Sequence, residues 1–200
     1  MISQILIATR NPDKAEEIKE IFGNRGFRIR TLLDFNHAEE IQEDGNTLQE
    51  NALKKAREAF KMIRIPTIAD DTGLEVDRLF GAPGVYSARY AGEDANYEDN
   101  MQKLLHEMAT VPIRDRSARF RTIAAYYDGE HSVTTEGVVE GMITTEPRGE
   151  NGFGYDPVFE TLETKQTFAE MNQKAKEAIS HRGRALRNLF LELQNRKILP

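Results

Sequence analysis

In the first part of the chain, short runs of apolar residues alternate with segments whose apolar residues recur at helical spacing. The run Gln4–Thr9 is short and rich in β-branched residues, which predicts a buried strand. Asn11 then suits the N-cap of a helix and Pro12 its first position, while Gly23 is typical of a helix end. Phe27–Leu33 predicts a second strand.

A capping-box pattern opens the next predicted helix, with Thr47 as the cap and Glu50 three residues later. The apolar run Thr67–Ala69 predicts a strand that delivers an aspartate pair, residues 70–71, into a turn, and Leu74–Val76 predicts another short strand. An ionised carboxylate loses its hydration near a core. The pair therefore indicates either a functional site or an ordinary Asp-rich turn.

The second half predicts a helix, a β-hairpin, a loop and a final helix. These elements are expected at Asn96–Met108, Ala118–Tyr127 with Ser132–Ile143, Arg148–Gly154 and Ser180–Arg196. Helices and strands interleave early and a hairpin follows late. The pattern therefore predicts an α/β fold with a mixed β-sheet and flanking helices, formed as one domain over residues 1–200.

Composition narrows the class of protein. Hydrophobic residues make up 39% and charged residues 30%, and there is no cysteine, so we expect a globular chain without disulfides or cysteine-bound zinc. A net charge of −6 argues against nucleic acid as a partner, although a local group of cations can still bind a small polyanion. No apolar run approaches the ~18 residues of a membrane span. The N-terminus lacks a signal-peptide pattern, so we expect a cytoplasmic protein with no membrane partner.

The junction of the first strand and the first helix suits an anion. A helix N-terminus offers N–H groups and a partial positive charge, and here Thr9 and Asn11 add neutral donors while Lys14 adds a cation. The glycines and the Gly-Lys-Ser/Thr of a Walker loop are missing. An ordinary capped helix with a surface lysine would show the same pattern.

Acidic residues form a second candidate group: Glu43, Asp44, Glu50, Asp70 and Asp71. Mg²⁺ prefers oxygen ligands and takes one or two carboxylates, with water and substrate phosphates completing its shell. Side chains alternate along a strand, so Asp70 and Asp71 are expected to point to opposite faces. Glu50 also fits its capping role.

A glycine-rich segment, residues 149–157 (GENGFGYDP), forms a third candidate group. Its glycines let the backbone approach a ligand closely, Phe153 offers a stacking face and Asp156 offers an acceptor. A planar heterocycle suits such a segment. A tight connection with aromatic anchors in the core is the alternative interpretation.

Lys176 and the start of the last helix form a fourth group. Ser180 fits an N-cap, so His181 and Arg182 fall in the first helical turn, where the helix dipole disfavours cations. That placement favours ligand contacts over a purely structural role, although a lone histidine near a helix start is often incidental.

These groups, read together, resemble the inosine triphosphate pyrophosphatase family, also called noncanonical purine NTP pyrophosphatases or XTP/dITP diphosphatases. The matching motifs follow the family's order along nearly the whole chain. They are Thr9-x-Asn11-x-x-Lys14, Thr47-x-x-Glu50-Asn51-Ala52, residues 69–74 (ADDTGL), residues 81–90 (GAPGVYSARY), residues 152–157 (GFGYDP) and Ser180-His181-Arg182.

The resemblance implies an elongated α/β fold of two lobes around a central cleft, a homodimer, and a divalent cation, usually Mg²⁺. It implies hydrolysis of ITP, dITP and XTP to the monophosphate and pyrophosphate. It assigns metal binding to Glu43 and Asp71, with Asp71 also the proton acceptor. Its implied substrate contacts are Thr9, Arg10, Asn11, Pro12, Asp13, Lys14, Thr72, Phe153, Gly154, Tyr155, Asp156, Lys176, His181 and Arg182. Lys55 is a further predicted substrate contact, which comes from the mechanistic hypothesis below. Thr72 stands where many members have serine, which keeps the hydroxyl.

The mechanistic hypothesis is that water attacks the α-phosphorus and that Asp71 positions or deprotonates it. Lys14, Lys55 and the cation stabilise charge on the phosphate oxygens. Base choice is expected to rest on the 6-carbonyl of hypoxanthine and xanthine, met by Arg182 or a backbone N–H. Two other hypotheses remain open: a Maf-like enzyme acting on pyrimidine or modified nucleotides, and a nucleotide sensor without turnover.

Overall fold

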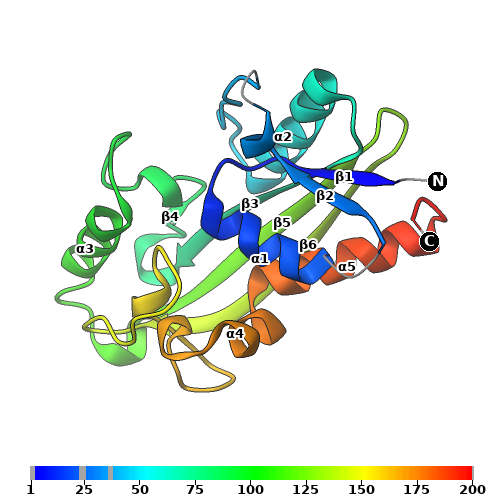
Figure 1. Ribbon diagram of the computed structural model, residues 1–200. Helices are drawn as coiled ribbons and strands as arrows, with labels where there is room; N and C mark the ends of the chain where they lie inside the picture. Colours follow the sequence, from blue (N-terminus) through cyan, green and yellow to red (C-terminus); the bar gives the residue numbers. More distant parts are fainter. Residues whose placement is uncertain (1–2, 23–25, 36–37, 200) are drawn as a thin grey trace. The chain divides into compact units, whose positions relative to one another are not determined.

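The computed structural model describes residues 3–22, 26–35 and 38–199 (Figure 1). The predicted helix end at Gly23 lies outside these residues, as do Met1 and Ile2. The helices are α1 (Pro12–Phe22), α2 (Leu48–Ile63), α3 (Tyr97–Glu107), α4 (Gln173–Ile179) and α5 (His181–Asn195). The strands are β1 (Gln4–Ile7), β2 (Arg28–Thr31), β3 (Thr67–Val76), β4 (Pro83–Gly84), β5 (Ser117–Tyr127), β6 (Ser132–Ile143) and β7 (Phe159–Thr161).

The strands form a mixed β-sheet. In the described part of the chain their order is β2-β1-β3-β5-β6-β7, and β4 pairs with β3. Strand β1 runs parallel to β2 and to β3, with Ile7 opposite Ile68, whereas β6 and β7 are antiparallel, with Ile143 opposite Phe159. The α/β class and the mixed sheet predicted from the sequence are therefore confirmed.

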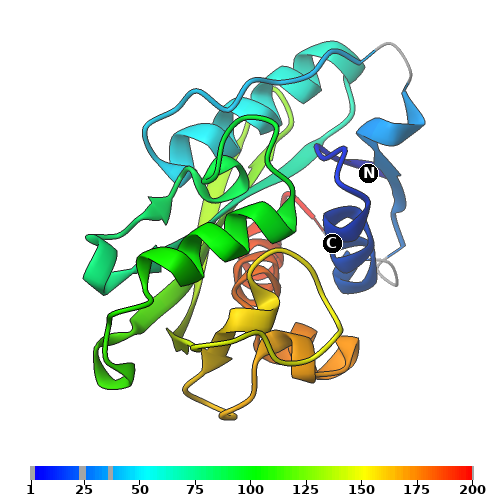
Figure 2. The same cartoon turned by 90° about the vertical axis from the view of Figure 1, so that its left-hand side faces the viewer.

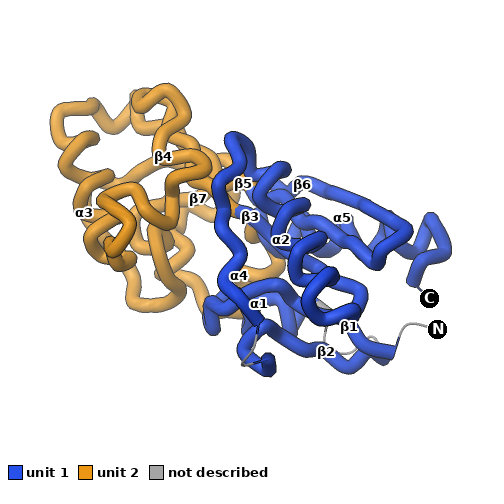
Figure 3. The backbone as a smooth tube through the Cα atoms, turned by 90° about the horizontal axis from the view of Figure 1, so that it is seen from above, with its two compact units in different colours: residues 1–71, 122–137, 181–200 blue, residues 72–121, 138–180 orange. Residues whose placement is uncertain are grey.

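The chain divides into two compact units (Figure 3). Unit 1 comprises residues 1–71, 122–137 and 181–200, and unit 2 comprises residues 72–121 and 138–180. Each unit is assembled from segments that are separated in the sequence. The single domain expected over residues 1–200 stays a prediction.

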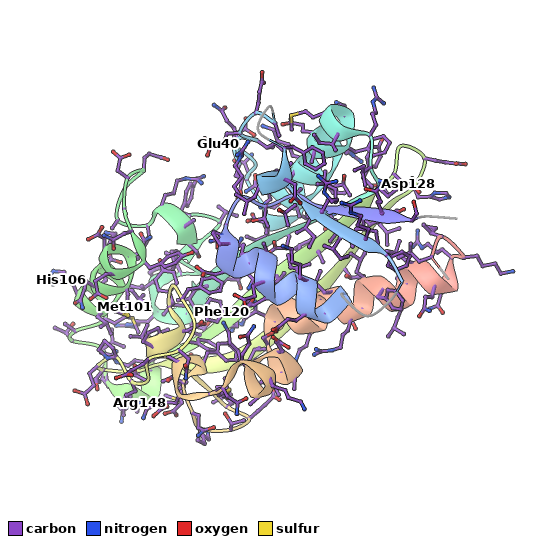
Figure 4. All side chains as sticks on the ribbon, in the orientation of Figure 1. Glu40, Met101, His106, Phe120, Asp128 and Arg148 are labelled. Carbon is purple, nitrogen blue, oxygen red and sulfur yellow. The ribbon has the colours of Figure 1, made fainter. Side chains whose placement is uncertain are left out.

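Each unit has its own apolar core. In unit 1, α1 and α5 lie side by side (Figure 1), and Ile18 of α1 and Leu189 of α5 are fully buried with Ile68 of β3. In unit 2 the ring of Phe120 (Figure 4) lies 4.6 Å from that of Phe159, centroid to centroid. These two cores hold the strands and helices that carry the polar groups described below.

The predicted turn at the aspartate pair is wrong. Strand β3 runs without a break from Thr67 to Val76, so residues 70–71 lie in mid-strand. Asp and Gly are typical of turns, but here the backbone is held by strand pairing and both carboxylates have cationic neighbours. At Gly73 a β-carbon would lie 2.6 Å from the carbonyl oxygen of Gly84, so the pairing of β3 with β4 requires glycine there.

The helix boundaries follow the predicted caps closely. Thr47 Oγ1 accepts a hydrogen bond from Glu50 N at 3.1 Å, as predicted, and Asn96, for which no cap was predicted, caps α3 in the same way. The Glu50 carboxylate, however, accepts from Asn46 N at 2.7 Å, one residue earlier than a capping box requires. The sequence interpretation missed α4, which begins after the N-cap Asn172.

No helix in the described ranges combines the length and the apolar character that a bilayer crossing would need.

Candidate active site

The turn from β1 into α1 is held by its own polar side chains. Asn11 Oδ1 accepts hydrogen bonds from Asp13 N at 2.9 Å and from Lys14 N at 3.2 Å, which confirms Asn11 as the cap. Thr9 Oγ1 accepts from Asn11 N at 3.1 Å. Pro12 has no N–H, and the next two backbone amides already donate to Asn11 Oδ1. The predicted affinity of this turn for an anion must therefore come largely from nearby cationic side chains.

The two cations of this turn point to different partners. The guanidinium of Arg10 donates to the carbonyl oxygen of Ala38. Lys14 Nζ lies 3.6 Å from Asp70 Oδ2, and its side chain keeps 21% of its surface exposed. Lys14 is therefore anchored at a buried carboxylate but still accessible from solvent.

Lys55 lies between two carboxylates within unit 1. Its Nζ is 2.9 Å from Glu43 Oε1 and 3.5 Å from Asp71 Oδ1. Burial alone would lower the pKa of Lys55, but Asp71 and Glu43 outweigh that effect and raise it above its ordinary value. Lys55 therefore stays a cation in the interior.

Asp71 is the carboxyl group of this cluster that holds a proton most readily. Burial, reinforced by the negative charge of Glu43, raises its pKa to about 6, although Lys55 opposes the change. Burial also acts on Glu43, but there Lys55 and Lys14 prevail and the pKa is lowered. Near neutral pH, Asp71 can thus accept a proton while Glu43 remains charged.

The Glu43–Asp71 pair fits a hard divalent cation. The two carboxylates interact directly, and the mutual repulsion that raises the pKa of Asp71 is the kind that a bound cation relieves. Residues 3–22, 26–35 and 38–199 contain no cluster of three or more His, Asp or Glu side chains able to enclose a metal. Mg²⁺ generally takes only one or two protein carboxylates and completes its shell with water and phosphate ligands.

Asp70 belongs to a separate ionic group. Arg182 Nε lies 3.1 Å from Asp70 Oδ2, and the same guanidinium pairs with Glu17. Burial alone would raise the pKa of Asp70, but Lys14 and Arg182 hold it well below its usual range. Asp70 and Asp71 thus have different partners, as expected for neighbours on opposite faces of a strand.

The first turn of α5 is buried. Only 3% of the Arg182 side chain is exposed, and its guanidinium pairs with Glu17 and Asp70. These two carboxylates offset the unfavourable interaction of a cation with the helix N-terminus. His181 Nδ1 lies 2.7 Å from Thr122 Oγ1. The structure therefore gives both residues contacts inside unit 1, and their roles toward a substrate stay predictions.

A second polar group lies in unit 2. Lys176 Nζ contacts Asp156 Oδ2 at 2.7 Å and lies 4.8 Å from the ring centroid of Phe153. Asp156 also accepts a hydrogen bond from Phe153 N at 2.9 Å, and the Phe153 ring lies 5.6 Å from that of Tyr97. Figure 2 shows the loop over residues 148–158 (yellow) beside α4 (orange), which carries Lys176.

Other predicted contacts in this segment have structural partners. The hydroxyl of Tyr155 donates to the carbonyl oxygen of Ser87 at 2.9 Å, and burial raises the pKa of this phenol. A β-carbon on Gly152 would lie 2.1 Å from Asp156 Oδ2, and this residue has a φ of +76°, so glycine is required there. Gly154 has a positive φ with open space around it, and Thr72 is half-buried.

The predicted site residues therefore separate into two sets, one in each unit. The set in unit 1 is Thr9, Arg10, Asn11, Pro12, Asp13, Lys14, Glu43, Lys55, Asp71, His181 and Arg182, and the set in unit 2 is Thr72, Phe153, Gly154, Tyr155, Asp156 and Lys176.

Sequence reasoning gave no role to Asn51 or Glu17. Asn51 is fully buried and donates to Asp71, and Glu17 pairs with Arg182. A signal for Asn51 was available, because Asn51 and Lys55 are one helical turn apart on the buried face of α2. Two polar residues on an apolar stripe need buried partners.

The fold and the unit 1 site define an α/β protein that places lysine side chains beside a pair of interacting carboxylates. The Ham1 family model matches residues 5–191. The chain is 49% identical to a dITP/XTP pyrophosphatase of Bacillus licheniformis, over 94% of this chain and 96% of that protein. A dITP/XTP pyrophosphatase of Bacillus subtilis is 46% identical, over 94% of this chain and 96% of that protein.

A solved structure gives the same result for the fold. The HAM1 protein from Coxiella burnetii superposes with a TM-score of 0.86 at 39% identity, covering 96% of this chain and 98% of that one. The chain belongs to the Ham1 family. This confirms the family indicated by the sequence motifs.

Proposed function

We propose that this protein hydrolyses noncanonical purine nucleoside triphosphates, namely ITP, dITP and XTP, to the monophosphate and pyrophosphate. It is a nucleoside-triphosphate pyrophosphatase, in agreement with the names of its relatives. The observation that carries the proposal is the unit 1 cluster, in which Lys55 joins Glu43 and Asp71. Lysine side chains bind phosphate oxygens. Carboxylates can accept a proton from a water molecule and can bind a metal cation.

The residues of unit 1 have separate roles in the cleavage of the phosphate anhydride. Lys14 and Lys55 bind phosphate oxygens and offset the charge that grows on them. Asp71 orients the attacking water and accepts its proton as the new bond to the α-phosphorus forms. The bond from that phosphorus to the bridging oxygen breaks, and pyrophosphate leaves with the electron pair. A side chain with a pKa of about 6 suits a proton acceptor near neutral pH.

We propose Mg²⁺ as the cofactor, held by Glu43 and Asp71. When bound, Mg²⁺ neutralises phosphate charge and lowers the pKa of coordinated water. Binding of a cation there would relieve the repulsion between Glu43 and Asp71. The support is the chemistry of this donor pair, since hard oxygen ligands select Mg²⁺ over softer metals.

The residues of unit 2 are proposed to contact the nucleoside. Phe153 offers an aromatic face, and Lys176 with Asp156 offers a donor and an acceptor fixed by their mutual contact. We further propose that the enzyme is a cytoplasmic homodimer that binds neither nucleic acid nor membrane. The net charge of −6 is consistent with that last expectation.

The test is a steady-state comparison of ITP, XTP, GTP, ATP and UTP with Mg²⁺, with pyrophosphate and phosphate measured separately. We expect pyrophosphate from ITP and XTP, with ATP slower by ~10⁴ if the 6-carbonyl is read by a buried donor. Preferential cleavage of UTP would favour the Maf-like alternative. Binding of ITP without turnover would favour the sensor. Equal rates on ATP and ITP would refute base selection.

A further inference from the structure

Asn51 uses both ends of its amide within unit 1. The side chain is fully buried in α2. Its Oδ1 accepts a hydrogen bond from Gly45 N at 2.8 Å, and its Nδ2 donates to Asp71 Oδ2 at 3.1 Å. One amide therefore connects the backbone that follows Glu43 with the carboxylate of Asp71.

The contact with Gly45 is close. A β-carbon at Gly45 would lie 2.6 Å from Asn51 Oδ1 and 2.8 Å from the β-carbon of Glu50. Gly45 comes two residues after Glu43 in the sequence. The position of the segment that bears Glu43 is thus tied to the amide of Asn51 by a hydrogen bond that needs a residue without a side chain.

The contact with Asp71 orients its carboxylate. Because Nδ2 of Asn51 binds Oδ2, the other oxygen, Oδ1, faces Lys55 Nζ at 3.5 Å. Lys55 lies one helical turn after Asn51 and also holds Glu43. Two neighbouring positions of one rigid helix therefore fix both carboxylates. Only a side chain that donates and accepts can make both contacts of Asn51, which excludes leucine and ionised aspartate.

We propose that Asn51 is a positioning residue that sets the spacing of Glu43 and Asp71, and thereby the affinity of this site for a divalent cation. The proposal rests on the proposed function only in assigning these two carboxylates to a cation. Partners of metal-binding side chains commonly change metal affinity or activity by ~10–100-fold when they are replaced.

The test uses two variants and a matched control. Asn51→Leu keeps the number and branching of the side-chain heavy atoms but removes both hydrogen bonds, and Gly45→Ala displaces the amide from the opposite side. The control is Asn100→Leu in unit 2. Asn100 is 2% exposed, donates to the Ala88 carbonyl at 3.0 Å and accepts from Ala91 N at 2.8 Å. Asn100→Leu therefore loses the same kinds of hydrogen bonds as Asn51→Leu, at a position that is distant in the sequence from Glu43 and Asp71.

Two readouts separate positioning from general destabilisation. The first is Mn²⁺ binding to the nucleotide-free, full-length protein, followed by electron paramagnetic resonance. The second is the Mg²⁺ concentration for half-maximal ITP cleavage, measured with the KM for ITP. We expect Asn51→Leu and Gly45→Ala to weaken Mn²⁺ binding by ~10–100-fold and to raise the half-maximal Mg²⁺ concentration, with a smaller change in KM. Asn100→Leu should lower the melting temperature but leave both cation readouts unchanged.

Each outcome bears on the proposal. Wild-type Mn²⁺ affinity in a folded Asn51→Leu or Gly45→Ala protein overturns it, as does an equal loss in the Asn100→Leu control. A wild-type protein that binds no Mn²⁺ also overturns it. If Mn²⁺ binding weakens as expected but the wild-type protein cleaves no ITP, the positioning role stands and the proposed function fails.

Discussion

The adjacent carboxylates of Asp70 and Asp71 have opposite electrostatic environments. Asp70 lies against Lys14 and Arg182, and these cations overcome the effect of burial and hold its pKa well below its usual range. Asp71 lies near Glu43 as well as Lys55, so burial and like charge raise its pKa to about 6. One strand thus provides a permanently charged anchor and, next to it, a group that can exchange a proton.

Replacing Asp71 with asparagine should stabilise the cation-free protein at about pH 8. Its folded-state pKa of about 6 exceeds the ordinary value of 3.8, so folding favours the protonated form and ionisation lowers stability. Asp71→Asn removes a cost of up to about 3 kcal/mol, equivalent to several degrees in melting temperature. The difference should shrink as the pH falls toward about 5. Calorimetry in a chelating buffer measures it.

Asp70→Asn is the matched control, for which we expect the opposite change in the free energy of unfolding. A depressed pKa contributes stability above the ordinary value of 3.8, and this stability is lost only as the pH falls through the folded-state value. Asp70→Asn should therefore lower the melting temperature at about pH 8. Destabilisation by both substitutions at that pH would contradict the assignment of opposite environments.

Arg182→Ala should destabilise unit 1 strongly. The substitution leaves Asp70 and Glu17 buried without their shared guanidinium, and breaking a buried ion pair costs about 3–5 kcal/mol. We expect the melting temperature to fall by about 6–20 °C. Arg196→Ala is the control, because Arg196 pairs with Glu192 at the surface and is 52% exposed. A thermal shift no larger than that of the control would show that the buried network contributes little.

Lys176→Met should weaken nucleoside binding more than turnover. Methionine keeps the aliphatic stem next to Phe153 but removes the charge that contacts Asp156. We expect a KM for ITP about 10-fold higher with a smaller change in kcat, because the lost contact is made in the ground state as well as the transition state. Lys174→Met is the control, since Lys174 lies exposed on the same helix. An unchanged KM would remove Lys176 from the nucleoside contacts.

Hydrolysis in ¹⁸O-labelled water should place the label in the monophosphate. Attack on the α-phosphorus forms the new P–O bond there, so the departing pyrophosphate keeps only unlabelled oxygens. Mass spectrometry of both products after brief turnover makes the assignment. Label in pyrophosphate would mean attack on the β-phosphorus, and the proposed role of Asp71 beside the α-phosphorus would be wrong.

The sequence was most informative where local chemistry determines structure. Asn11 and Thr47 occupy the predicted cap positions because a cap needs only a side-chain oxygen and the next turn of backbone. The mixed sheet followed from the order of strand and helix patterns. In contrast, the break predicted at residues 70–71 failed because strand pairing and long-range cations stabilise a sequence that locally favours a turn.

The least predictable features of the site depend on distant partners. Glu17 and Arg182 are 165 residues apart in the sequence, and no local pattern pairs them. Asn51 was visible within a motif, but its hydrogen bonds are made with Gly45 and with a carboxylate 20 residues away. Long-range pairing of polar groups therefore had to come from the structure.

The proposed role of Asp71 is tested by pyrophosphate release from ITP with Mg²⁺, measured for the wild-type protein and for Asp71→Asn. Circular dichroism and melting temperature establish that both are folded. We expect pyrophosphate and IMP from the wild type, and a loss of turnover by ~10²–10⁴ in Asp71→Asn as the proton acceptor is removed. Near-wild-type turnover by the folded Asp71→Asn protein would contradict that role.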